Sequence, residues 1–293
     1  MKRVLAWPSK AKHFLPVFLF FSMRLTALQP ALNITQYAHT AWTRRDGHLP
    51  GSVFAVSQTL DGALWIGTEF GLLRFDGITF QPLTPLGDGA LLSDTVWALA
   101  PGSDGSLWIG TRAGLSRWKA GRLENFLTSE GPSGPGVVSL LVDHTGTIWL
   151  GTAGFRSGGL CRLEGTRLHC FGPTEGFSGR GVHALFEDGT GNLWAGSEAG
   201  LYQWKPGAAP LSGLIASSPP ITSIAQRPNG EIIVVTNRSN ALHRFADGGV
   251  VPFLKSAAAD QVQMRVLLTD RDGALWIGTN GQGLLHFGQG RMD

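Results

Sequence analysis

The chain has little charge and only a small imbalance between its two signs. Of its 293 residues, 24 are Lys or Arg and 21 are Asp or Glu, which gives a net charge of +3. The sequence has no block of basic residues. Nucleic acid is therefore not expected as a partner.

The sequence also lacks recognisable catalytic motifs. It has no serine nucleophile elbow and no phosphate loop, and its 8 histidines are scattered without metal-ligand spacing to Cys, Asp or Glu. We therefore expect no catalytic residue, no metal and no cofactor.

Long apolar runs are absent except near the N-terminus. Basic residues within positions 2–12 precede an apolar run at 14–23 that is too short to span a bilayer. This order is typical of a signal peptide. We interpret 1–31 as a signal peptide, with an uncleaved membrane anchor as the alternative, and 32–293 as the folded domain. An exported protein, periplasmic or extracellular, with no later membrane span is expected.

The sequence does contain a repeated phrase. The motif Leu64-Trp65-Ile66-Gly67-Thr68 recurs in further copies, and Ile232–Thr236 is a divergent copy. The tryptophan or its counterpart stands at positions 65, 108, 149, 194, 233 and 276, with spacings of 43, 41, 45, 39 and 43. A period near 40 built from strand-like units indicates a repeat architecture.

Each repeat is predicted to form four short strands. In the first repeat these are Val53–Val56, Ala63–Thr68, Leu72–Phe75 and Ile78–Leu83. Asp-Gly between apolar runs favours a hairpin with a primed turn, which needs positive φ at both central residues. Because a lone four-stranded sheet cannot bury both faces, the blades are expected to stack around an axis. The predicted fold is an all-β propeller of about six four-stranded blades.

The recurring tryptophans are expected to be wedges between blades rather than ligand contacts, because a large ring fills such an interface. They are Trp65, Trp108, Trp149, Trp194 and Trp276.

The two ends of the domain are complementary. Trp42 aligns with Phe126 and Phe171, which end fourth strands, so Ile34–Trp42 is predicted as a fourth strand without its first three. The last repeat supplies only three strands, ending at Phe287. We predict that the N-terminal strand completes the last blade. The alternative is an open arc of a truncated seven-bladed propeller, which would expose an apolar blade face.

These repeats resemble a known family. The strings Leu64–Gly77 and Leu107–Trp118, and the opening Trp42–Pro50, are similar to the two-component regulator propeller repeat. The resemblance covers nearly all of 34–293. It implies an exported sensory propeller, usually followed by a β-sandwich, a membrane helix and a histidine kinase or cyclic-dinucleotide synthase.

The chain departs from the usual plan of that family. It carries no kinase motif and no later membrane helix, and it has fewer repeats than the paired seven-bladed propellers common there. The resemblance therefore implies a sensing or binding module whose partner is a signalling domain or protein.

A ligand is expected on one face of the propeller. Loops joining strand four to strand one, and strand two to strand three, share that face and are more varied than the tight turns opposite. There, the second residue of strand one and the residue after Gly-Thr differ between repeats while their neighbours stay similar. Together with the loop after Trp42, they give the candidate binding residues Arg44, Arg45, His48, Phe54, Glu69, Trp97, Arg112, Arg156, His183, Glu198, Arg265 and Asn280.

This mixture suits a small polar or saccharide-like ligand, with Trp97 or Phe54 stacking on a sugar. Solvated loop ends are the plainer interpretation. Two other functions stay open. A propeller lyase or hydrolase would act at the central funnel, where His183 with Glu198 or Glu69 is the available acid–base pair. A protein-interaction scaffold would instead use an apolar rim.

Cys161 and Cys170 are the only cysteines and flank one predicted hairpin. They lie directly opposite each other if Gly165-Thr166 is the two-residue turn, and on a diagonal if Glu164-Gly165 is. Export favours a disulfide, but the sequence leaves both registers open.

Overall fold

The structure is a computed structural model that describes residues 40–42, 45, 47–84, 89–126, 136–153, 159–205, 214–237, 242–254, 262–288 and 290–292. The chain divides into two units, Met1–Ala31 and Leu32–Asp293, and all of these residues belong to the second. The signal peptide or anchor at 1–31 lies outside them and stays a prediction. Within the described ranges, no helix has the length and apolarity that a membrane crossing requires.

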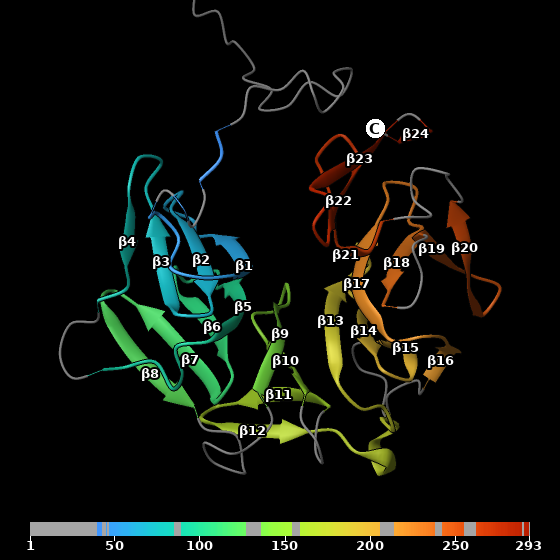
Figure 1. The fold of residues 1–293 in the computed structure, drawn as a ribbon. Coiled ribbons are helices and arrows are strands. Elements are labelled where there is room, and N and C mark those ends of the chain that lie inside the picture. Colours follow the sequence, from blue (N-terminus) through green and yellow to red (C-terminus); the bar gives the residue numbers. More distant parts are fainter. Residues whose placement is uncertain are drawn as a thin grey trace, which may run out of the picture. The chain divides into compact units, whose positions relative to one another are not determined.

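Six four-stranded antiparallel sheets form a β-propeller, and each sheet is one blade (Figure 1). Strands pair in chain order within every blade. Blade 1 consists of β1 (Val53–Gln58), β2 (Leu64–Thr68), β3 (Gly71–Phe75) and β4 (Phe80–Pro82). Blade 2 consists of β5 (Val96–Pro101), β6 (Leu107–Thr111), β7 (Gly114–Lys119) and β8 (Arg122–Phe126). Blade 3 consists of β9 (Gly136–Val142), β10 (Ile148–Ala153), β11 (Leu160–Glu164) and β12 (Arg167–Cys170).

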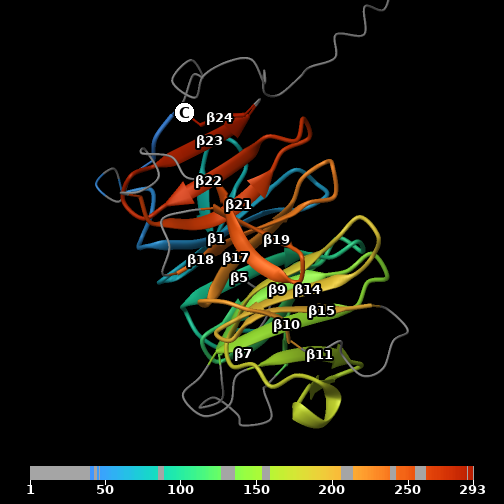
Figure 2. The same ribbon diagram turned by 90° about the vertical axis from the view of Figure 1, so that its right-hand side faces the viewer.

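The second half repeats this order after one short 3-10 helix, η3 (Pro173–Glu175). Blade 4 consists of β13 (Val182–Glu187), β14 (Leu193–Ser197), β15 (Gly200–Trp204) and β16 (Leu214–Ser217). Blade 5 consists of β17 (Ile221–Gln226), β18 (Ile232–Thr236), β19 (Leu242–Ala246) and β20 (Gly249–Leu254). Blade 6 consists of β21 (Met264–Thr269), β22 (Leu275–Thr279), β23 (Leu284–Gly288) and β24 (Arg291–Met292). The first strands of successive blades lie against one another from β1 to β21 (Figure 2).

The turn between the first and second strands differs from the predicted primed turn. In blade 1 the amide of Gly62 donates to the carbonyl of Thr59, and the amide of Thr59 donates to that of Ala63. Within this turn only Gly62 has positive φ, at 83°. The connection is therefore a three-residue loop that ends in a left-handed glycine, a common hairpin alternative. Glycines with positive φ stand at the same place in the other blades, namely Gly105, Gly146, Gly191, Gly230 and Gly273.

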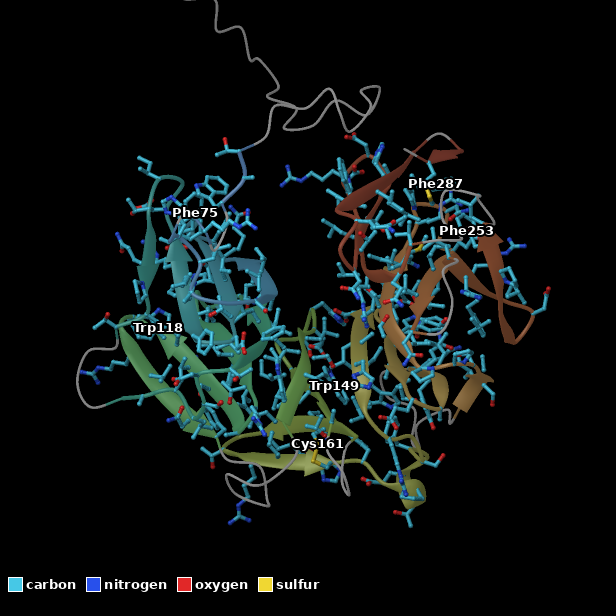
Figure 3. The ribbon with its side chains drawn as sticks, viewed as in Figure 1. Phe75, Trp118, Trp149, Cys161, Phe253 and Phe287 are labelled. Atoms are coloured by element: carbon cyan, nitrogen blue, oxygen red, sulfur yellow. A yellow bond between two sulfur atoms is a disulfide. The ribbon has the colours of Figure 1, made fainter. Side chains whose placement is uncertain are left out.

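Apolar cores lie between neighbouring blades, as stacking requires. Between blades 1 and 2, Trp65 and Leu72 pack against Val96, Leu107 and Ile109. The equivalent tryptophans Trp108, Trp149 (labelled in Figure 3) and Trp194 are also buried, whereas Trp276 in blade 6 is only half-buried. The divergent copy of the motif in blade 5 lacks the tryptophan but still contributes to the apolar core, because Ile233 and Val235 are fully buried there.

The last blade differs from the predicted strand exchange. Its fourth strand is β24, which pairs with β23 through Phe287↔Met292 and Gly288↔Arg291. Gly290, with φ of 79°, allows the tight reversal that makes this possible. Residues 34–39 of the predicted N-terminal strand lie outside the described residues. Trp42 packs instead on blade 1, with its ring centroid 5.1 Å from that of Phe75.

Candidate functional site

Every blade carries a β-bulge at the same position. The register between the first and second strands skips one residue of the first strand, at Phe54, Trp97, Val138, His183, Thr222 and Arg265. A bulge residue leaves the ladder, and its side chain is redirected away from the pleat. These are the positions that vary between repeats, so the bulge explains why packing does not constrain them. We call them the bulge ring.

The residue after Gly-Thr is tied to the start of the first strand in the same blade. Its backbone N–H donates to a carbonyl just ahead of that strand. The pairs are Glu69 to Ser52 (3.0 Å), Arg112 to Thr95 (3.1 Å), Glu198 to Arg180 (3.0 Å), Asn237 to Pro220 (2.9 Å) and Asn280 to Gln263 (2.8 Å). Five blades thus place one variable loop residue beside the bulge residue, and both predicted sets meet there at one edge of the blade.

Blade 4 brings two ionisable groups together at this edge. The Nε2 atom of His183 lies 3.9 Å from Oε1 of Glu198. A Cβ on Gly181 would lie 2.9 Å from that same Glu198 oxygen, so the glycine leaves room for the pair. Burial lowers the pKa of His183, although the Glu198 carboxylate acts in the opposite direction. The imidazole is therefore neutral at neutral pH, as a general base or a hydrogen-bond acceptor requires.

Aromatic and polar groups occupy the same edge in other blades. The Trp97 ring lies so close over Gly136 that a Cβ there would overlap it. Phe54 is 48% exposed, and Arg112 is exposed beside Trp97. In blade 6, Nδ2 of Asn280 donates to Oε1 of Gln263 at 3.1 Å. Apolar rings therefore lie at this edge on blades 1 and 2, and polar groups lie there on blades 2 and 6.

Two further candidates lie in the segment that precedes blade 1. Arg45 is exposed in the loop before blade 1. The His48 ring lies 5.8 Å from that of Phe80 on the outer strand β4. Arg44 and Arg156 lie outside the described residues. Among the residues that the structure does describe, no group of three His, Cys, Asp or Glu side chains could hold a metal ion.

The opposite edge of the blades carries the turns between the first and second strands, and we call it the turn side. One interaction repeats there in blades 3, 4 and 6. The indole Nε1 of Trp194 donates to Oδ2 of Asp188 at 2.8 Å, and Trp149 and Trp276 donate likewise to Asp143 and Asp270. Burial opposes ionisation of Asp188, but donors on Trp194, Asn192 and Thr190 outweigh it and hold its pKa well below the usual value. These bonds lock the turns of blades 3, 4 and 6 to their wedge tryptophans.

Two grooves on the turn side were not predicted. One of about 580 Å³ lies between blades 2 and 3 and is lined by Asp104, Trp108 and Arg117, and another of about 320 Å³ lies between blades 1 and 2. The Arg117 guanidinium is 5.3 Å from the Trp108 ring centroid. A sequence signal was present, because Gly102 replaces the Asp or Thr that precedes each other wedge tryptophan by six residues.

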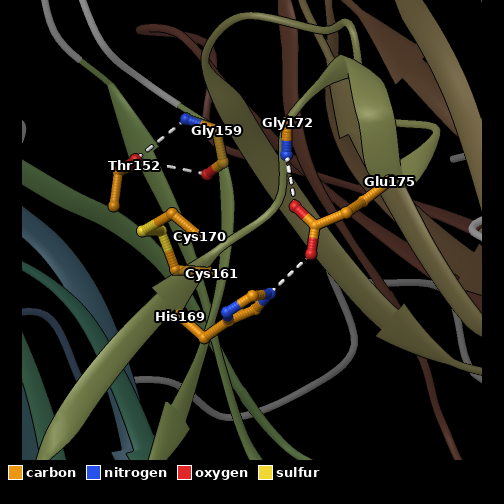
Figure 4. Close-up of a disulfide and its surroundings, with 7 residues drawn as sticks. All are labelled: Thr152, Gly159, Cys161, His169, Cys170, Gly172 and Glu175. Atoms are coloured by element: carbon orange, nitrogen blue, oxygen red, sulfur yellow. Dashed lines mark hydrogen bonds and ion pairs between the residues drawn. A yellow bond between two sulfur atoms is a disulfide. The ribbon is translucent and has the colours of Figure 1, made fainter.

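The cysteines lie directly opposite each other and form a disulfide (Figure 4). Glu164 pairs with Arg167, so Gly165-Thr166 is the turn, as one of the two predicted registers required. Next to it, His169 Nε2 lies 2.7 Å from Oε1 of Glu175. The disulfide joins the two outer strands of blade 3 and lies outside the bulge ring.

Comparisons with known proteins agree with the fold. A family model described as two component regulator propeller matches residues 90–113 and 259–281. The extracellular domain of a hybrid two component system from B. thetaiotaomicron has a TM-score of 0.53 and 19% identity, over 81% of this chain and 38% of that one. This chain therefore spans well under half of that domain. A search of curated proteins finds no match.

Propellers with other roles are similar as well. Virginiamycin B lyase from Staphylococcus aureus has a TM-score of 0.62 and 14% identity, over 82% of this chain and 83% of that one. The WD40 propeller domain of Doa1 has a TM-score of 0.61 and 15% identity, over 81% and 79%. At such identities the likeness shows the fold alone. The chain is a six-bladed β-propeller in which residues 90–113 and 259–281 match the two component regulator propeller model, and its fold is similar to those of a two component system's extracellular domain, a lyase and a WD40 propeller.

Proposed function

We propose that the protein is an exported sensory module that binds a small polar or saccharide-like ligand at the bulge ring. The observation that carries this proposal is the set of six bulges, which present different side chains from one repeated position. Bulges redirect side chains and are frequent beside functional sites. Similarity to an extracellular domain of a two component system supports export and sensing.

The chemistry of the ring supports the ligand class. Trp97 and Phe54 offer apolar rings that stack on the flat face of a sugar. Arg112, Glu198 and Asn280 offer charged and neutral hydrogen-bonding groups nearby. Ligand sites commonly combine aromatic walls with a few polar groups.

An oligosaccharide panel titrated by calorimetry tests the proposal. We expect at least one oligosaccharide to bind, and Trp97→Ala or Arg112→Ala to weaken binding about tenfold, a loss of roughly 1.4 kcal/mol. Arg122→Ala is the matched control, because Arg122 is exposed on β8 at the turn-side end of blade 2. Equal weakening by the control, or no binding across the panel, would argue against the site or the ligand class.

A lyase or hydrolase is the second candidate. The His183–Glu198 pair and the neutral imidazole favour it, as does the similarity to virginiamycin B lyase. Turnover of a bound ligand by the wild type, abolished in His183→Asn while binding is kept, would establish an enzyme. Unchanged ligand after prolonged incubation would favour the sensor.

A further inference from the structure

The groove of about 580 Å³ between blades 2 and 3 lies where two elements of the repeat are missing at once. The first is the acceptor for the wedge tryptophan. In blades 1, 3, 4 and 6 the residue six positions before that tryptophan accepts its indole hydrogen, through a hydroxyl of Thr59 in blade 1 and through an aspartate in the others. Blade 2 has Gly102 there, and among the residues that the structure describes no other group accepts the indole hydrogen of Trp108.

The second missing element is an aromatic ring supplied by the next blade. In five blades the residue after the third-strand partner of the wedge position is aromatic, namely Phe75, Trp118, Trp204, Phe245 and Phe287. Blade 3 has Leu163 at this place. In three interfaces the ring lies edge-on to the wedge tryptophan of the preceding blade, with centroids 4.8–6.2 Å apart. Trp108 instead meets Phe126 of its own blade, at 5.5 Å.

Both absences open the same groove. Gly102 and Leu163 line it together with Trp108 and Phe126. The corresponding groove between blades 1 and 2 keeps the acceptor Thr59 and the ring of Trp118, and its volume is about 320 Å³. The larger groove is within the usual size range of small-molecule sites. The two substitutions therefore leave room for a ring and for a hydrogen-bond acceptor beside one tryptophan.

Blade 1 indicates which acceptor suits this place. Its turn, like that of blade 2, has an aspartate paired with an arginine of the third strand. There the Thr59 hydroxyl accepts from Nε1 of Trp65 at 3.0 Å and donates to Oδ1 of Asp61 at 2.5 Å. One hydroxyl thus connects the indole to the carboxylate.

The carboxylate of blade 2 faces the corresponding space. A Cβ on Gly102 would lie 2.8 Å from Oδ1 of Asp104. A hydrogen bond from Lys119 is the largest cause that lowers the pKa of Asp104, so this side chain is ionised and can only accept. A second carboxylate there would be repelled by it. A hydroxyl group can accept from Trp108 and donate to Asp104.

We propose that the groove between blades 2 and 3 binds a phenolic compound, an aromatic ring that carries a hydroxyl group. The ring lies against Leu163 and edge-on to Trp108, where other interfaces hold an aromatic side chain. The hydroxyl accepts the indole hydrogen of Trp108 and donates to the carboxylate of Asp104. This site is on the turn side, and it does not rest on the function proposed for the bulge ring.

Three related probes test the ligand class on the full chain. They are p-cresol, toluene, which lacks the hydroxyl, and 4-methylcyclohexanol, which lacks the flat ring. We expect p-cresol to bind saturably in ligand-observed NMR titrations and each of the others to bind at least about fivefold more weakly. Trp97→Ala, which alters the bulge ring, should leave p-cresol binding unchanged.

Two variants restore the missing elements one at a time. Leu163→Phe returns the ring and should weaken p-cresol binding at least about tenfold. Leu60→Phe is its matched control, because Leu60 lines the neighbouring groove and is 77% exposed. Gly102→Thr combined with Ser106→Ala gives blade 2 the acceptor of blade 1 and removes a hydroxyl that the new Cβ would overlap. This double variant should bind p-cresol no more tightly than toluene, and it tests the site even if Leu163→Phe does not fold.

Four outcomes would overturn the proposal. The first is that p-cresol does not bind to a chain whose circular dichroism is native. The second is that toluene or 4-methylcyclohexanol binds as tightly as p-cresol. The third is that Trp97→Ala weakens p-cresol binding while the groove variants do not, which would move the ligand to the bulge ring. The fourth is that a methyl glucoside binds in place of p-cresol and is lost in the double variant, which would make the groove a sugar site.

Discussion

The two faces of the propeller obey different rules. On the turn side, blades 3, 4 and 6 repeat one device, an aspartate that accepts the indole hydrogen of the wedge tryptophan. On the opposite side, each blade has the same backbone bulge but a different side chain on it. The turn side therefore specifies the fold, and the bulge side is free to specify a ligand.

The difference follows from what each position touches. Asp188 is buried and accepts hydrogen bonds from three neighbouring residues, so a replacement without an acceptor would leave their donors unsatisfied. A bulge residue such as Arg265 is exposed and lies outside the ladder. Mutations on the two faces should therefore separate stability from binding.

The largest expected effect comes from filling the space between blades. In Gly151→Ala the new Cβ would overlap the carbonyl oxygen of Val182 and the hydroxyl of Ser139, which itself donates to that carbonyl at 2.9 Å. We expect a loss of about 3 kcal/mol or more in the free energy of unfolding, measured by urea titration. Gly172→Ala is the control, because a Cβ there meets nothing within 4 Å. Equal losses in both variants would mean that close packing at the repeat glycine is not what joins the blades.

A smaller loss is expected on the turn side. Asp188→Ala removes the acceptor of Trp194, Asn192 and Thr190, which should cost about 2–3 kcal/mol at neutral pH. Asp272→Ala, in an exposed turn of blade 6, should change stability little.

The pH dependence of the Asp188 effect has a defined sign. The pKa of Asp188 is lowered in the folded state, so its contribution is complete above the ordinary value of 3.8 and is lost as the pH falls below it. The difference between wild type and Asp188→Ala should shrink there. A difference that stays constant through this range would show that the carboxylate charge is not responsible.

The smallest effect is expected on the bulge side. His183→Gln should alter the free energy of unfolding by less than about 1 kcal/mol at pH 7.5. Because burial lowers the pKa of His183, the wild type should lose stability as the pH falls below 6.5, and the variant should escape that loss.

His144→Gln is a control of opposite sign. The Glu187 carboxylate raises the pKa of His144, so this contribution is present below 6.5 and is lost as the pH rises through the higher folded value. Melting temperatures across the pH range compare the two variants. Identical pH profiles would remove the distinction between the faces.

The repeat made most of the fold predictable. The spacing of the tryptophans and the turn glycines fixed six blades, and the strands of blade 1 were predicted to within a few residues. The short strand β24 escaped prediction because two residues have no detectable periodicity. The exact turn type was also missed, since Asp-Gly occurs both in two-residue primed turns and in three-residue loops.

From the sequence, the candidate site could be predicted only as a set of positions whose residues differ between repeats. Comparison of the repeats identified positions such as Trp97 and His183, but the type of neither residue predicts a β-bulge. A bulge is a property of the register between two strands, so it becomes visible only when both are placed. The grooves on the turn side were missed for a similar reason, because they depend on how neighbouring blades sit against each other.

The bulge has a consequence for how such a protein changes over generations. Natural proteins lie only a little above the stability they need, and most substitutions lower it. A side chain that leaves the ladder at a bulge can be exchanged while the backbone bonds on either side remain. Six such positions on one rim, at Phe54, Trp97, Val138, His183, Thr222 and Arg265, let selection try new recognition chemistry blade by blade without first reinforcing the scaffold.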